Sequence, residues 1–285
     1  GVNPDDYTSS IDLLSNKDDY QFNVISAPGL NNTQHSTATT KLVTLAQGRT
    51  DCIAVIDLVA YGANVGDVVT QAAGFDSSYA ATYWPWLQTL DANTGQIVWA
   101  PASTYIPGVY AFTDASADPW FAPAGLIRGA LGSVIRAERK LTSGNRDTLY
   151  EANVNPIATF PGSGVVVFGQ KTLQKRASAL DRVNVRRLLI ALKSFIVQVS
   201  DNLVFEQNTN ATRNAFLAEV NPYLESVQQR QGLFAFKVVM DASNNTPDVI
   251  DRNELVGQIY LQPTKTAEFI ILDFNVLPTG ATFPE

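Results

Sequence analysis

The sequence predicts an α/β fold in the first half of the chain, followed by an α+β unit in the second half. Strand and helix patterns alternate up to about residue 160, an order that produces a mostly parallel sheet covered by helices. Residues 52–59 (CIAVIDLV) form a nearly continuous apolar run, which is typical of a strand covered on both faces. Further along, two long helix patterns precede the remaining strand patterns. With 285 residues, 45% of them hydrophobic, the chain can bury one large core or two moderate cores.

In the first half, residues 91–95 (DANTG) are expected to form a hairpin turn, because the glutamate of a calcium loop does not follow them. Pro28-Gly29 is expected to end the first strand. A helix over 101–117 is entered through Pro101 and disturbed by Pro107-Gly108. The expected strands are 20–27, 52–59, 79–90, 96–99, 156–160 and 165–168, and the other expected helices are 33–47, 66–73 and 143–151.

Residues 119–129 (PWFAPAGLIRG) contain two prolines and two glycines and are not expected to form a regular element. We expect Trp120 and Phe121 to act as an apolar plug that seats this rigid loop in the core.

The second half contains two helix patterns and three strand patterns. The second helix has Thr209 or Asn210 as its cap and Pro222 as a kink, and Gln231-Gly232 is expected to end it. The first helix is indicated by one apolar stripe at helical spacing, formed by Val185, Leu188, Leu189, Leu192, Phe195, Ile196 and Val199. Strands are expected at 233–240, 255–261 and 267–276, with a short helix from Thr246-Pro247 to about residue 253.

A domain boundary is expected near residues 164–178. The predicted organisation is an α/β region at 1–163, an α+β domain at 164–266 and a C-terminal arm at 267–285.

The last expected strand, residues 267–276 (AEFIILDFNV), is apolar on both faces. Side chains alternate along a strand, so Ile270, Leu272, Phe274 and Val276 share one face, and Phe269 and Ile271 share the other. Such a strand at a sheet edge attracts a pairing partner. It is therefore expected either to be buried in its own domain or to pair with another chain.

Composition argues against several function classes. A net charge of −7 and a pI near 4.8 argue against nucleic acid as the main partner, and no apolar run has the length of a membrane span. Cys52, in an apolar run, is expected to be a buried core residue. With one cysteine and one histidine, His35, neither a metal site nor a cofactor is expected. Because the chain begins at Gly1, we expect a fragment or a processed product.

Two alternative functions remain open at this point. An α/β hydrolase is disfavoured because His35 would have to serve any triad, and because Asp51 and Asp57 bracket a strand without forming a carboxylate pair. A glycan- or surface-binding module is suggested by four aromatic side chains in the expected strands. Aromatic residues in strands more often have a core or interface role, which disfavours this function. These aromatics are Tyr83, Trp84, Trp86 and Trp99.

Several stretches, in this order, resemble the tail sheath proteins of contractile phage tails and related injection machines. They cover nearly the whole chain: NVISAPGL (23–30), DCIAVIDL (51–58), DPWFAPAGLIRG (118–129), VVVFGQKTL (165–173), RVNVRRLL (182–189), VFEQNT (204–209) and AEFIILDF (267–274). The Asn- and Thr-rich first half is similar to the T4-like branch.

The resemblance implies the later part of a non-catalytic domain with subtilisin-like topology, followed by a C-terminal helix and sheet domain with a terminal strand arm. It implies a subunit that polymerises helically around a tail tube and contracts to drive the tube through the host envelope, with baseplate and neck proteins as further partners. The expected location is the virion, after assembly in the bacterial host cytoplasm.

The terminal arm, with Phe269, Ile270, Ile271, Leu272, Phe274 and Val276, would add a strand to a neighbouring subunit. The resemblance also implies contacts with the tube or with other subunits through charged residues. The candidates are Arg182 and Arg186 on the first helix of the second half, and Asp248, Asp251, Arg252 and Glu254 near the short helix.

Overall fold

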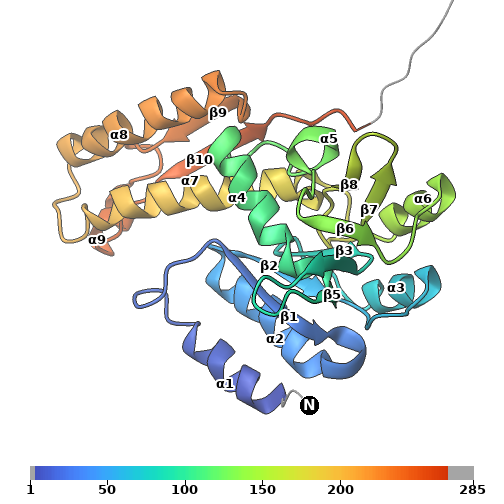
Figure 1. Ribbon diagram of the computed structural model, residues 1–285. Coiled ribbons are helices and arrows are strands. Elements are labelled where there is room, and N and C mark those ends of the chain that lie inside the picture. The colour runs from blue at the N-terminus through green and yellow to red at the C-terminus, as the bar shows by residue number, and fades with distance from the viewer. Residues whose placement is uncertain (1–3, 269–285) are drawn as a thin grey trace, which may run out of the picture.

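A computed structural model describes residues 4–268 of the chain (Figure 1). A five-stranded sheet forms the centre of the first half, in the order β1-β2-β3-β7-β8. The first four strands in this order run parallel, and β8 runs antiparallel to β7. The bounds are β1 Val24–Asn31, β2 Ile53–Asp57, β3 Ala80–Trp84, β7 Asn155–Phe160 and β8 Gly164–Val167.

Helices cover both faces of this sheet. One core contains side chains from α1 (Pro4–Leu13), α2 (Asn32–Arg49), α3 (Val65–Ala72) and α6 (Ser143–Glu151). The opposite core contains side chains from the short 3-10 helix η1 (Ala102–Thr104), from α4 (Ile106–Ser116) and from the start of α7 (Val183–Asp201). Strand β2 contributes Ala54 and Ile56 to the first core and Ile53 and Val55 to the second. The apolar run at 52–59 is therefore a strand covered on both faces, as predicted.

A second, three-stranded antiparallel sheet has the order β5-β4-β6. Its strands are β4 (Leu87–Leu90), β5 (Ile97–Ala100) and β6 (Val134–Ala137), and the predicted hairpin turn joins β4 to β5. The expected single strand at 79–90 is two strands, β3 and β4, separated by Pro85, whose ring nitrogen has no proton for a sheet ladder. Neither α1 nor β6 was predicted.

The second half forms its own layered unit. Helix α7 and helix α8 (Asn210–Gln229) pack against a two-stranded antiparallel sheet of β9 (Leu233–Val239) and β10 (Gln258–Pro263). The short helix α9 (Pro247–Asp251) lies between these strands in sequence. Thr209 caps α8 by accepting a hydrogen bond from the Thr212 N–H, as expected. Within residues 4–268, none of the helices has the length and apolarity needed to cross a membrane.

The loop at 119–129 joins the two halves. Trp120 is buried in the core of the second unit, and its indole N–H donates to the Arg230 carbonyl at 2.9 Å. Asn184 on α7 donates to the Trp120 carbonyl at 3.1 Å. The predicted plug is therefore present. The end of the segment does form a regular element, α5 (Gly125–Arg128), because Gly125 adopts φ +90° just before the turn.

The predicted end of the first strand was wrong. Strand β1 continues past Pro28-Gly29 to Asn31, since Gly29 adopts φ +96° and the register with β2 shifts between Ser26 and Asn31. The boundary between residues 163 and 164 separates β7 from β8, which pair from Ile157–Val167 to Phe160–Gly164. Strand β8 thus belongs to the sheet of the first half.

Candidate assembly interface

Within the described residues, the β9–β10 hairpin is a sheet with two free edges, because the two strands pair only with each other. Phe236 and Leu261 face each other across the ladder and pack on the α7–α8 core, while Tyr260 pairs with Lys237 on the exposed face. Phe234 is 74% exposed. Free edges of this kind can accept a further strand through backbone hydrogen bonds.

The chain leaves this hairpin and crosses back towards the first half, as the red segment beyond β10 shows in Figure 1. The Thr264 N–H donates to the Gly232 carbonyl at 3.2 Å, and Asn184 donates to the Thr266 hydroxyl at 3.1 Å. Glu268 is the last residue that the structure describes. Residues 269–276, which contain every predicted arm residue, lie outside the described part.

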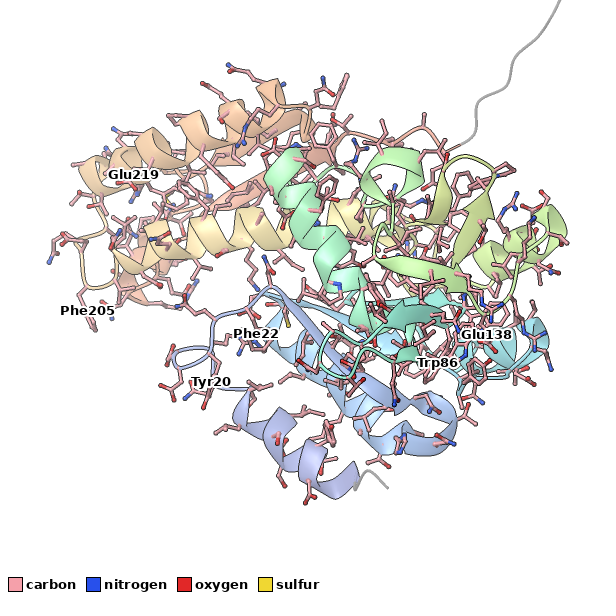
Figure 2. The ribbon with its side chains drawn as sticks, in the orientation of Figure 1. Tyr20, Phe22, Trp86, Glu138, Phe205 and Glu219 are labelled. Atoms are coloured by element: carbon pink, nitrogen blue, oxygen red, sulfur yellow. The ribbon has the colours of Figure 1, made fainter. Side chains whose placement is uncertain are left out.

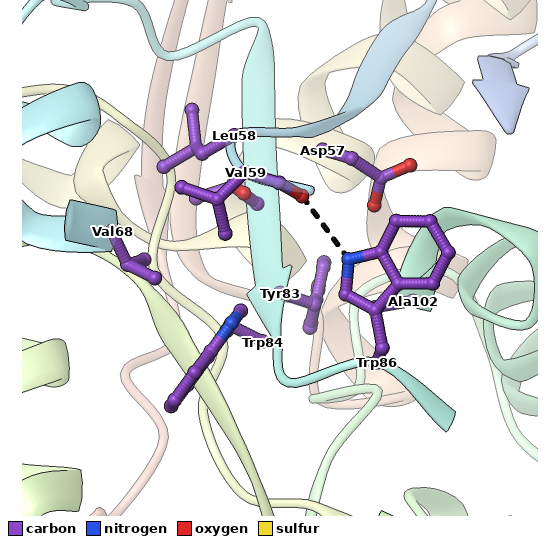
Figure 3. A pocket seen from close by; sticks show the side chains of 9 residues that line it. Asp57, Leu58, Val59, Val68, Tyr83, Trp84, Trp86 and Ala102 are labelled. Atoms are coloured by element: carbon purple, nitrogen blue, oxygen red, sulfur yellow. Dashed lines mark hydrogen bonds between the residues drawn. The ribbon is translucent and has the colours of Figure 1, made fainter. Parts of the chain in front are cut away.

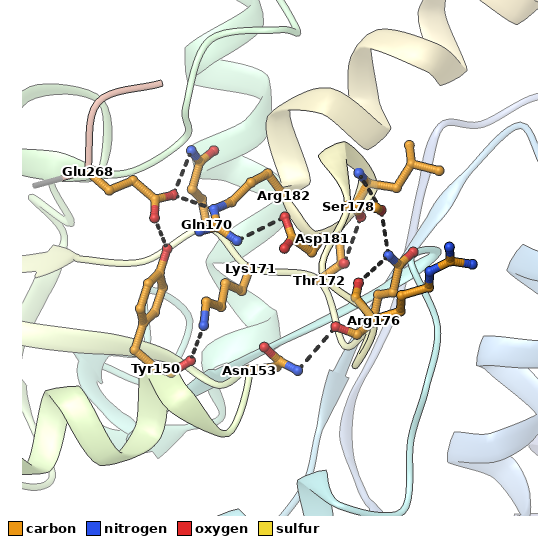
Figure 4. Close-up of polar contacts among 12 residues, drawn as sticks. Tyr150, Asn153, Gln170, Lys171, Thr172, Arg176, Ser178, Asp181, Arg182 and Glu268 are labelled. Carbon is orange, nitrogen blue, oxygen red and sulfur yellow. Dashed lines mark hydrogen bonds and ion pairs between the residues drawn. The ribbon is translucent and has the colours of Figure 1, made fainter. Parts of the chain in front are cut away.

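Glu268 is held by three side chains from different elements (Figure 4). Its carboxylate accepts from Arg182 Nε at 2.7 Å, from the Tyr150 hydroxyl at 2.8 Å and from Gln170 Nε2 at 3.3 Å. The Glu268 side chain is only 16% exposed. We call these four residues the Glu268 clamp. It joins the segment after β10 to α6, to the segment after β8 and to the entry of α7.

The electrostatics of the clamp keep its donors protonated. Burial raises the pKa of Tyr150 well above its ordinary value, and the neighbouring Glu268 carboxylate raises it further. The Tyr150 hydroxyl therefore remains a donor across the physiological range. Lys171 lies 4.4 Å from the centre of the Tyr150 ring and donates to the Tyr150 carbonyl at 2.7 Å.

The clamp sits on a loop that is closed at its base. Lys171 and Arg182 form an antiparallel bridge, and the Val183 N–H donates to the Gln170 carbonyl at 2.7 Å. One step further into the loop, Thr172 bonds to the carbonyls of Asp181 and Leu180 through its N–H and its hydroxyl. The connection between the first sheet and α7 is thus closed at its base by backbone and side-chain hydrogen bonds.

The two predicted contact residues on α7 have different surroundings. Arg182 pairs with Asp181 at 2.9 Å in addition to Glu268, so it binds within this chain. Arg186 is only 6% exposed, lies 3.9 Å from the centre of the Tyr79 ring and donates to the Ser78 hydroxyl. The prediction of Arg186 as a surface contact was wrong, because α7 packs against both cores and leaves no free face at this position.

The other predicted contact residues surround α9. Asp248, Asp251, Arg252 and Glu254 are all exposed, and Arg252 pairs with Glu254 at 3.0 Å. The same end of the second unit carries Phe205, which is 99% exposed in the loop between α7 and α8 (Figure 2). The structure does not bring the α9 charges together with Arg182, which belongs to the clamp.

Asp57 is the most perturbed carboxyl group of the described chain. It is 5% exposed at the end of β2, and it accepts from the Ser103 N–H at 3.2 Å and from the Ser103 hydroxyl at 2.5 Å. Burial raises the pKa of Asp57 to about 6, although both Ser103 bonds lower it. The adjoining cavity, lined by Tyr83, Trp84 and Trp86 among others, has a volume of about 10 Å³, the space of one water molecule (Figure 3).

This geometry does not extend to a triad. The His35 ring accepts from the Asn31 N–H at 3.4 Å, at the start of α2. Asp51 forms a bidentate pair with the buried Arg49 at the other end of β2. In the described part of the chain, no group of three His, Cys, Asp or Glu side chains is arranged to hold a metal ion.

The aromatic residues that suggested glycan binding are mostly internal. Tyr83 and Trp84 are each 3% exposed, and Tyr83 shares a 2.8 Å hydrogen bond with Tyr110. Trp86 donates from its indole nitrogen to the Val59 carbonyl at 3.1 Å, as Figure 3 shows. Only Trp99 lies on the outer three-stranded sheet, where it packs against Tyr61. Trp84 therefore has no free face on which a sugar could stack.

Sequence reasoning did not identify the roles of Glu268 and its three partners. One signal was present: Glu268 is an acidic residue directly before the apolar run of residues 269–272. Its partners Tyr150 and Gln170 are 118 and 98 residues away in sequence, so the chain pattern alone does not connect them.

The described residues thus combine a mixed α/β architecture with a two-stranded hairpin that pairs with no third strand among them and with a buried, hydrogen-bonded Glu268. Residues 1–173 match the family described as phage tail sheath protein central domain, and residues 176–277 match the phage tail sheath C-terminal domain. The chain belongs to the phage tail sheath family, which confirms the resemblance seen in the sequence.

Relatives with curated descriptions are tail sheath proteins of phages. That of Vibrio phage KVP40 is 38% identical over 220 residues, which are 77% of this chain and 33% of the relative. That of Enterobacteria phage T4 is 34% identical over 267 residues, covering 88% of this chain and 40% of the relative. The chain thus spans between a third and two fifths of the length of these two relatives.

Solved structures share the fold. The sheath complex of an extracellular contractile injection system, PVC, in its contracted state has a TM-score of 0.79 at 26% identity, covering 90% of this chain and 71% of that one. The contracted helical sheath of the anti-feeding prophage has a TM-score of 0.79 at 24% identity, covering 96% and 76%. These likenesses confirm the mixed α/β architecture.

Proposed function

We propose that this chain forms part of a subunit that polymerises helically into a tail sheath and contracts to drive a tail tube through the host envelope. Membership of the sheath family supports this proposal, as do relatives that are themselves tail sheath proteins. A helical assembly needs a head-to-tail contact between unlike surfaces of identical subunits. An open strand edge and a protruding strand from another copy form such a contact.

The observation that carries the proposal is the β9–β10 hairpin, whose two edges pair with no other strand among residues 4–268. The arm residues Phe269, Ile270, Ile271, Leu272, Phe274 and Val276 supply the complementary strand of a neighbouring subunit. Backbone hydrogen bonds to the hairpin edge give strength, and the alternating apolar side chains fix the register.

Further parts of the proposal concern partners, location and layout. The partners are other copies of the subunit, the tail tube, and baseplate and neck proteins, with the exposed charges around α9 as the tube contact. The subunit assembles in the bacterial host cytoplasm, resides in the virion and carries no catalytic activity. The four parallel strands, with helices on both faces, support a domain of subtilisin-like topology. The gap between the two family matches, after residue 173, supports a domain boundary within the predicted range of residues 164–178.

Deletion of residues 267–285 from the full-length protein tests this proposal. We expect a soluble subunit that no longer forms striated tubes in negative-stain electron microscopy, whereas a control that lacks only residues 277–285 still assembles. Tubes of normal length and yield from the 267–285 deletion would refute strand exchange through this arm.

A further inference from the structure

The route of the chain between the hairpin and the clamp is fixed at three successive points. Thr264 bonds to the Gly232 carbonyl, Thr266 bonds to Asn184, and Glu268 enters the clamp. The first two anchors belong to the second unit, whereas the clamp includes Tyr150 on α6 of the first half. The last anchor therefore moves the point of departure of the chain away from the hairpin and onto the first half.

The hydrogen bonds of the clamp fix the orientation of the Glu268 side chain. A carboxylate that is 16% exposed and accepts three hydrogen bonds, one of them from a guanidinium at 2.7 Å, holds its residue in one orientation. The carboxylate has a donor on each side, and Arg182 also pairs with Asp181. Loss of the Glu268 charge would leave Arg182 paired through Asp181, so the body of the protein would keep its own ion pair.

We propose that Glu268 is a positioning residue that sets the point and the direction in which the C-terminal arm leaves the subunit. This inference rests on the proposed strand exchange between subunits. Without the clamp, the nearest remaining anchors are Thr266 and Thr264. Two to four extended residues span at most about 7–14 Å, so the point at which the arm leaves would shift over a distance of this order.

We call the point at which the arm leaves the subunit its root. The position of the root sets the effective concentration of the arm at the edge of a neighbouring hairpin. A tethered strand binds with an effective concentration that depends on whether its root lies at the correct distance from the edge. A fixed root also removes conformational freedom from the arm before it binds. Release of the clamp should therefore weaken assembly without unfolding the subunit.

The test uses the full-length protein with Glu268→Gln, which keeps the size of the side chain and removes its charge. Glu219→Gln is the matched control, because Glu219 is an exposed glutamate on α8 that belongs neither to the clamp nor to the charges around α9. Two quantities are measured: the protein concentration at which half of the subunits sediment as tubes, and the thermal unfolding midpoint of the unassembled subunit.

We expect Glu268→Gln to raise the half-assembly concentration by on the order of tenfold, with the unfolding midpoint equal to that of Glu219→Gln. Glu268→Asp, which keeps the charge, should recover part of the loss. Equal assembly of the Glu268→Gln and Glu219→Gln proteins would overturn the inference. So would a fall in the unfolding midpoint that accounts for the loss of assembly, because the clamp would then only stabilise the body.

The deletion of residues 267–285 separates this inference from the proposed function. If that deletion prevents assembly and Glu268→Gln does not, the arm functions without a positioning role for Glu268. If the deletion protein assembles normally, strand exchange itself is refuted, and the positioning role falls with it.

Discussion

The buried carboxyl group of Asp57 should make the stability of this fold depend on pH in a direction opposite to that of most carboxylates. The pKa of Asp57 is raised from 3.8 to about 6, with burial as the main cause. Between these two values the folded state binds more protons than the unfolded state does, so stability falls as the pH rises through this window. Below about pH 4 the penalty is absent, and above about pH 6 it is fully present.

The magnitude follows from the difference between the folded and the unfolded pKa. About two units correspond to roughly 3 kcal/mol of the free energy of unfolding, since each unit is worth 1.36 kcal/mol. Asp57→Asn removes the charge and keeps both bonds to Ser103: the amide oxygen accepts from the Ser103 N–H, and the amide nitrogen donates to the hydroxyl. The variant should therefore be more stable than the native protein at neutral pH.

The assay is urea unfolding followed by tryptophan fluorescence at about pH 4 and about pH 7.5. We expect Asp57→Asn to exceed the native protein by about 3 kcal/mol at the higher pH and by less than about 1 kcal/mol at the lower pH. Asp18→Asn, at an exposed position, is the control for the loss of one carboxylate. An Asp57→Asn protein that is equally or less stable than the native protein at neutral pH would refute the reasoning.

Four further substitutions test the packing of the two units. Arg49→Lys removes the contacts of a buried guanidinium with the Asp51 carboxylate and three backbone carbonyls. It should lower the free energy of unfolding by about 3 kcal/mol. Amide hydrogen exchange over residues 14–20 should become faster. Gly232→Ala places a methyl group 2.6 Å from a methyl of Val227 and should cost about 1–3 kcal/mol, measured by chemical unfolding. Leu224→Ala in the fully buried core of the second unit should cost about 2–5 kcal/mol, whereas Phe205→Ala at an exposed loop should change stability by less than about 0.5 kcal/mol; equal effects would contradict the burial seen here.

Elements with a dense local pattern could be predicted from the sequence. Helix α6 was expected at the residues where it lies. Strand β2 could be recognised because both of its faces are covered, so residues 53–56 are all apolar. Helices α7 and α8 followed from their apolar stripes and from the cap at Thr209. Both strands of the candidate interface, β9 and β10, were also expected.

Features that depend on contacts between distant residues could not be predicted. Strand β6 has only four residues, too few to show an alternating apolar pattern, and it forms because it pairs with the distant strand β4. Arg186 has the spacing of a solvent-facing residue on an isolated helix, and it is buried because Ser78 and Tyr79 from the first half pack over it. The hairpin edges, which are unpaired within residues 4–268, and the clamp on Glu268 likewise depend on how distant segments pack in the folded chain.

Helix α7 contributes to two cores at once, with Val183 and Ile190 in the core below the first sheet and Leu188 and Leu192 in the core of the second unit. A helix of 19 residues is about 28 Å long, so α7 forms a rigid connection between the core of the first half and the core of the second unit. Tilting it by about 10° would move its far end by about 5 Å and open both cores. We therefore expect the two units, which α7 holds together, to rotate as one rigid body when the contacts of the subunit change.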